Sequence, residues 1–128
     1  MHGNEWIVEA YGCPEENLSN LVLMQSIVRE IIAQMQLTPV ADPIWHRFPV
    51  TGGITGMALL TESHLACHTF PEFGSLCLNV FCCRPRAAWD FDRLKQLIGA
   101  TKVCVREVTR AYQNVDSPTG LAAGSHKG

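Results

Sequence analysis

Charge is scarce in this chain of 128 residues: Asp, Glu, Lys and Arg make up 17% of it, against roughly 25% in typical soluble domains. The formal net charge of -2 indicates neither the basic surface that nucleic acids select nor a membrane-binding surface. We therefore expect a protein that covers part of its surface by forming an oligomer. The length suits one domain, which is small for an enzyme whose cleft is formed within a single chain. An active site shared between subunits fits this size.

Lysine is especially rare. The sequence has Lys95, Lys102 and Lys127, which we expect on a helix, on the solvent side of a strand and in the C-terminal tail. None lies in an apolar run of the kind that activates a lysine amine for covalent catalysis. This distribution argues against a pyridoxal enzyme.

Long apolar runs and the features of a secretory leader are absent as well. No segment has transmembrane length, so we expect no membrane contact. Six cysteines occur without any Cys-x-x-Cys spacing, and the apolar content is high enough for a hydrophobic core that needs no disulfide bonds. We therefore expect free thiols in a reducing cytoplasm.

Apolar periodicity predicts two helices and six strands. The strands are expected at residues 5–11, 44–48, 54–61, 63–69, 76–83 and 101–108, and the helices at 14–36 and from 90 or 92 to 98. Four strands in succession argue against a doubly wound parallel sheet. The sequence predicts an α+β fold, a two-layer sandwich in which a largely antiparallel sheet carries helices on one face. Residues 1–112 form the expected single domain, and residues 113–128, rich in Ser, Pro, Gly and Ala, a loose tail.

Polar side chains cluster unusually at residues 55–72, in an otherwise apolar run. Ser63 falls at the junction of two predicted strands, but Glu-Ser-His is not the Gly-x-Ser-x-Gly turn of a serine hydrolase. His64, His68 and Cys83 are candidate metal ligands, although their spacing matches no common zinc pattern. For each of these residues alone, a satisfied core position is an equally good interpretation.

Three segments carry a resemblance that gives a third interpretation. They are Glu62-Ser63-His64-Leu65, His68-Thr69-Phe70-Pro71-Glu72 and Val80-Phe81-Cys82-Cys83. In order and spacing they resemble the small prokaryotic S-adenosylmethionine decarboxylase proenzymes, over most of residues 5–111. The resemblance implies a homodimer and self-cleavage between Glu62 and Ser63, with a pyruvoyl cofactor generated from Ser63.

The resemblance also implies a role for each matching residue. Ser63 would attack the preceding carbonyl, Thr55 would steady the tetrahedral intermediate, and His68 would be the base. Cys83 would protonate the substrate carbon after carbon dioxide leaves. Phe48 would stack on adenine and Glu72 would bind the ribose hydroxyls, unless Phe48 is only a core residue at a strand end.

Departures from the family pattern surround these residues. Ala66-Cys67, Phe70, Asn79 and Arg84 replace the usual Ser-Ile, Trp, Asp and Gly. The expected function is decarboxylation of S-adenosylmethionine for polyamine synthesis, without a metal. Two alternatives remain: the same pyruvoyl machinery acting on ornithine or arginine, and a noncatalytic or metal-binding relative that uses His64, His68 and Cys83.

Overall fold

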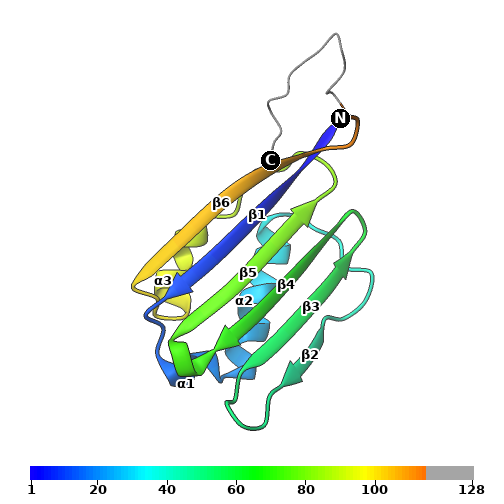
Figure 1. Cartoon of the computed structure of the whole chain (residues 1–128). Helices are drawn as coiled ribbons and strands as arrows, with labels where there is room; N and C mark the ends of the chain where they lie inside the picture. The colour runs from blue at the N-terminus through cyan, green and yellow to red at the C-terminus, as the bar shows by residue number, and fades with distance from the viewer. Residues whose placement is uncertain (115–128) are drawn as a thin grey trace.

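An antiparallel sheet with helices on one face is the framework of the protein (Figure 1). The computed structural model describes residues 1–114, and within them six strands form one sheet in the order β2-β3-β4-β5-β1-β6. The elements are β1 (His2–Tyr11), α1 (Glu15–Leu18), α2 (Leu21–Gln34), β2 (Ile44–Arg47), β3 (Ile54–Leu60), β4 (Ser63–Phe70), η1 (Pro71–Phe73), β5 (Ser75–Cys82), η2 (Phe91–Arg93), α3 (Leu94–Leu97) and β6 (Lys102–Ala111). This confirms the predicted fold class. The expected tail lies almost entirely outside the described residues.

Element boundaries differ from the prediction at three places. The helix expected over residues 14–36 is two helices, because the Asn20 side chain accepts a hydrogen bond from the Leu23 N–H at 3.0 Å and starts α2 afresh. The second expected helix is a 3-10 turn followed by a single α-helical turn. Strands β1 and β6 are longer than predicted because they pair with each other along their whole length, from His2 opposite Ala111 to Tyr11 opposite Lys102.

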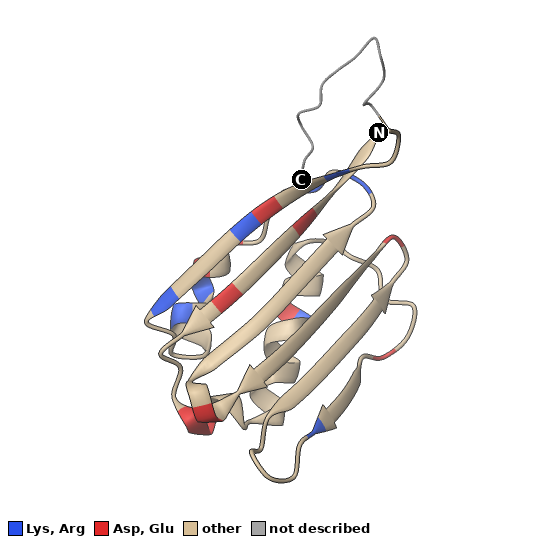
Figure 2. Cartoon of the chain, in the orientation of Figure 1, with Lys and Arg blue, Asp and Glu red and all other residues tan. Residues whose placement is uncertain are grey.

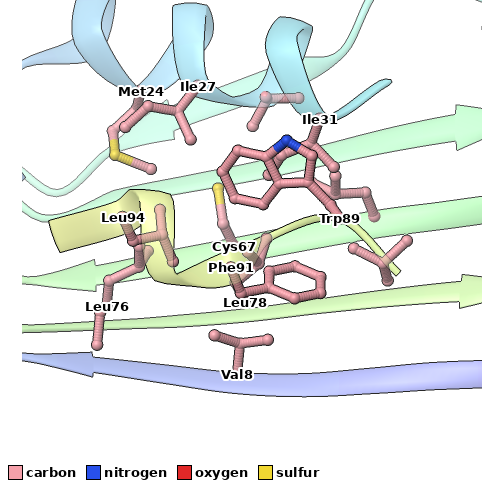
Figure 3. Close-up of a cluster of buried hydrophobic side chains, with 14 of the residues drawn as sticks. Val8, Met24, Ile27, Ile31, Cys67, Leu76, Leu78, Trp89, Phe91 and Leu94 are labelled. Carbon is pink, nitrogen blue, oxygen red and sulfur yellow. The ribbon is translucent and has the colours of Figure 1, made fainter. Parts of the chain in front are cut away.

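The hydrophobic core lies between the sheet and the helices (Figure 3). Helix α2 places Met24, Ile27 and Ile31 against inward-facing residues of the strands. Trp89 and Phe91 pack edge to face at 5.4 Å and close the core beside α3. Each such buried side chain contributes about 1.5–3 kcal/mol, so packing fixes the helix-facing side of β1, β3, β4 and β5. Among residues 1–114, no helix is long and apolar enough to cross a membrane.

Among residues 1–114, no helix covers the other face of the sheet, here called the open face (Figure 1). Strands β3, β4 and β5 contain no Asp, Glu, Lys or Arg. Strand β2 has one charged residue, Arg47, and the other charges of the sheet lie on β1 and β6 (Figure 2). There Glu5 pairs with Arg110 and Glu9 with Arg106, each at 2.5 Å. Over β2 and β3, by contrast, Ile44, Met57 and Leu59 are exposed. The open face is therefore half ionic and half uncharged.

Candidate active site

The hairpin between β3 and β4 places the expected cleavage bond. Leu60 pairs with Ser63, which leaves Thr61 and Glu62 as a two-residue turn. Ser63 is buried, and the strand register sets it on the helix side, between Leu60 and Cys82. The Glu62 carbonyl accepts a hydrogen bond from the Cys83 N–H at 2.7 Å. The carbonyl that Ser63 would attack is thus already bound to a backbone donor, which would stabilise a developing negative charge on its oxygen.

Cys83 follows the last residue of β5 and is exposed, whereas its neighbour Cys82 is buried toward the core. Burial raises the pKa of the Cys82 thiol, and it raises that of Cys67 to about 11. These two thiols are neutral packing groups under ordinary conditions. Of the two adjacent cysteines, only Cys83 is placed where a bound molecule can meet its thiol.

Two further side chains close around this turn. Arg84 Nε lies 3.1 Å from Glu62 Oε1, with both side chains substantially exposed. The Tyr112 hydroxyl donates a hydrogen bond to the Cys83 carbonyl. Sequence reasoning missed the tyrosine, because it follows the end of a strand and belongs to no motif.

His68 lies on the open face, toward the far end of β4. It pairs across the strands with Thr55, and Thr55 Oγ1 is 3.1 Å from His68 Nδ1. The next residue, Thr69, is buried and accepts from the Ile54 N–H while donating to the Leu18 carbonyl, both at 2.8 Å. These bonds tie β3, β4 and α1 together and so fix the strand end that carries His68.

Beside His68 lies a cavity of about 390 Å³, within the range of small-molecule sites. Its walls come from the loop after β2, the end of β4 and η1: Phe48, Pro49, Val50, Thr51, His68, Thr69, Phe70 and Glu72. Phe48 is 49% exposed, so it is not the core residue that the alternative interpretation assumed. Its ring meets that of His46 edge-on at 5.1 Å, and this supporting contact was not foreseen from the sequence.

The expected site residues therefore fall into two groups. Glu62, Ser63 and Cys83 meet at one end of β4, and Thr55, His68, Phe48 and Glu72 meet at the other. His68 comes five positions after Ser63 on one continuous strand, a distance of about 16 Å, and the odd number of positions puts the two side chains on opposite faces. One chain does not bring the expected nucleophile and base together.

The metal-binding alternative gains no support from this arrangement. Across residues 1–114 the structure contains no group of three His, Cys, Asp or Glu side chains that could hold a metal ion. His64 instead packs against Phe81, with ring centroids 5.5 Å apart.

Comparison with known proteins shows which family the chain resembles. The family model described as S-adenosylmethionine decarboxylase matches residues 4–111. S-adenosylmethionine decarboxylase proenzymes are similar to the chain: that of Archaeoglobus fulgidus is 37% identical over 63% of this chain and 70% of its own length, and that of Thermotoga petrophila 31% identical over 91% and 90%. The crystal structure of the adenosylmethionine decarboxylase from Aquifex aeolicus has the same fold, with a TM-score of 0.72 at 18% identity, covering 91% of this chain and 96% of that one. The chain belongs to the S-adenosylmethionine decarboxylase family.

Proposed function

We propose that the protein is a self-processing decarboxylase that converts S-adenosylmethionine to decarboxylated S-adenosylmethionine and carbon dioxide, for polyamine synthesis. The observation that carries the proposal is the Glu62 carbonyl, held by the Cys83 N–H next to a buried Ser63, in a chain that matches the family across residues 4–111. All six cysteines are free, which suits work in a reducing cytoplasm.

Processing begins when Ser63 Oγ attacks the Glu62 carbonyl carbon. The bond from that carbon to the Ser63 nitrogen breaks, an ester forms, and the Cys83 N–H stabilises the oxyanion on the way. A base then removes the Ser63 α-proton, and the bond between Ser63 Cβ and Oγ breaks, which leaves Glu62 as a carboxylate chain end and a double bond between the Cα and Cβ of residue 63. Addition of water and loss of ammonia turn the remaining segment into a pyruvoyl group at residue 63. Cys83, beside this turn, is exposed and so accessible to a substrate.

The base for this step comes from a second copy of the chain in our proposal. The uncharged half of the open face, over β3 to β5, is the surface that a second sheet would cover. In a two-fold interface the same patch meets itself, so opposite ends of β4 can face each other. The Ser63 end of one chain then meets the His68 end of the other. The homodimer would contain two composite sites.

The substrate would likewise contact the His68 end of one chain and the Ser63 end of the other. Phe48 offers a flat face for adenine and Glu72 an acceptor for the ribose hydroxyls, both at the cavity beside His68. The pyruvoyl group supplies an electron-withdrawing carbonyl that takes up the electrons released by decarboxylation. Cys83 then delivers a proton to the substrate carbon.

Denaturing mass spectrometry tests the cleavage. We expect two chains, residues 1–62 and 63–128, the second beginning with a pyruvoyl group. Ser63→Ala should stay intact, whereas Ser26→Ala, which alters an exposed serine on α2, should be cut like the wild type. A single intact wild-type chain after long incubation would remove the enzyme interpretation.

A mixing experiment tests the shared site. Ser63→Ala and His68→Ala chains, carrying different tags, are produced separately and together. Neither should be cut alone. In the mixture only the His68→Ala chain should be cut, because it keeps Ser63 and receives the partner's His68. Cleavage of His68→Ala by itself would contradict the assignment of the base.

Carbon dioxide release identifies the substrate when S-adenosylmethionine, ornithine and arginine are assayed side by side. We expect release from S-adenosylmethionine. Turnover of a free amino acid, with none of S-adenosylmethionine, would change the substrate while leaving the processing chemistry in place.

A further inference from the structure

Tyr112 reaches across one strand, β1, to the residue that we propose as the proton donor. It follows the last residue of β6, just beyond the part of the chain that the family model matches. Alternation from Arg110 sets Tyr112 on the open face, where Cys83 also lies. Between them runs β1, and its residue at this level is Gly3. The Tyr112 hydroxyl crosses above Gly3 and donates to the Cys83 carbonyl.

Gly3 makes this crossing sterically feasible. A Cβ atom at that position would collide with the Tyr112 hydroxyl and with the Cys82 carbonyl oxygen. Gly3 does not have a positive φ. The glycine is therefore needed because it leaves space, and not because of an unusual backbone conformation. Because Gly3 has no side chain, it leaves the space on the open face that the Tyr112 side chain occupies.

The tyrosine is also held as a hydrogen-bond donor. Although its ring is half-exposed, burial of the hydroxyl is the main cause that raises the pKa of Tyr112, and the neighbouring Cys83 thiol raises it further, against a smaller lowering by Arg110. The hydroxyl therefore keeps its proton near neutral pH and can donate it to a carbonyl.

We propose that Tyr112 is a positioning residue for Cys83, and this inference rests on the role proposed above for that thiol. Cys83 is bound on both sides: its N–H donates to the Glu62 carbonyl and its own carbonyl accepts from Tyr112. Beyond it the chain runs without regular structure until η2. Two hydrogen bonds on one residue restrict its backbone torsions, and these torsions set the direction of the Cα–Cβ bond that carries the thiol, which places the acid for the substrate carbon.

Tyr112→Phe removes the hydroxyl and keeps the ring that packs over Gly3. Self-cleavage should still go to completion. The kcat should fall about 10-fold, as expected for one lost hydrogen bond, while KM changes less than about twofold, because Tyr112 does not line the cavity beside His68. A misplaced acid should also raise the fraction of turnovers that convert the pyruvoyl terminus to alanine, which peptide mass spectrometry detects. Tyr11→Phe, a half-exposed tyrosine at the far end of β1, is the matched control and should behave like the wild type.

A double-mutant cycle separates positioning from general structural support. In a Cys83→Ala background, Tyr112→Phe should have no further effect on kcat, because the thiol that it directs is gone. Equal kcat in Tyr112→Phe and wild type, or the same 10-fold loss in the Cys83→Ala background, would overturn the inference. Failure of the wild-type chain to cleave would instead count against the proposed function, so the two failures are distinguishable.

Discussion

The two ends of strand β4 are built in different ways. At the Ser63 end, position is set by backbone: a two-residue turn, a strand register and an N–H to carbonyl bond of 2.7 Å. At the His68 end it is set by side chains, with Thr55 bonded to the imidazole and Phe48 and Glu72 at the rim of a cavity of about 390 Å³. In our proposal the two ends have different roles, with bond cleavage at the Ser63 end and ligand recognition at the cavity beside His68.

Register is what makes the Ser63 end specific. Ser63 lies opposite Cys82, and the hydrogen bond from Cys83 to Glu62 continues the same ladder one residue further. Because side chains alternate, a slip of one residue would move Ser63 to the open face and separate the carbonyl from its donor. The buried residues of β4, Leu65 and Cys67, prevent such a slip because it would expose them.

Cys83→Ala tests the Ser63 end where the expected effect is largest. The variant keeps the backbone N–H that binds the Glu62 carbonyl, so it should still cleave itself. Its turnover should fall about 100-fold to 10,000-fold, the usual cost of losing a positioned acid. Steady-state release of carbon dioxide from the processed enzyme measures this.

Cys82→Ala is the matched control, since it removes the adjacent thiol on the other face of the strand. We expect activity within a few-fold of wild type and a lower melting temperature, because a buried side chain is truncated. Wild-type activity in Cys83→Ala would refute the assignment of the acid.

At the other end of β4, Phe48→Ala and Glu72→Gln should weaken substrate binding. Loss of a hydrogen bond to a charged group costs about 1.5–3 kcal/mol, so KM should rise about 10-fold to 100-fold in Glu72→Gln with a smaller change in kcat. Cleavage should also proceed in both variants. Glu16→Gln, on α1 and outside the cavity, controls for the loss of one negative charge. A fall in kcat at unchanged KM would show that these residues do not act in binding.

Thr69→Val tests what holds the His68 end in place. Valine fills nearly the same volume but leaves the buried Ile54 N–H and Leu18 carbonyl without their side-chain partner. An unsatisfied buried group costs about 1–3 kcal/mol, so the free energy of unfolding should fall by at least that amount. Denaturant titration of the uncleavable Ser63→Ala background measures it without interference from processing. A loss below about 0.5 kcal/mol would mean that these two hydrogen bonds contribute little net stability.

The sequence predicts the local features of this site but not its long-range contacts. Alternation and turn residues are local signals, so the sheet, the hairpin and the location of the 62–63 bond in a turn could be predicted. The separation of His68 from Ser63 also follows from five residues on one strand, once that strand is known to be continuous. Contacts between distant segments leave no such signal. The Thr69 bond to Leu18 and the Tyr112 bond to Cys83 join residues that no period or motif relates.

Arg84 provides the smallest and most specific test of the Ser63 end, because the family usually has glycine there. Its bridge to Glu62 spans the turn that contains the cleavage bond, but both side chains are substantially exposed, and such pairs contribute about 0–1 kcal/mol. Arg84→Gln should therefore slow self-cleavage by no more than about fivefold. Near 1 M salt, where the screening length falls to about 3 Å, the variant and the wild type should converge. Arg93→Gln breaks an ion pair with Glu30 away from the turn and should not change the rate. Cleavage half-lives followed by denaturing electrophoresis at low and high salt decide the matter: a difference that persists at high salt would mean that Arg84 acts through packing rather than charge.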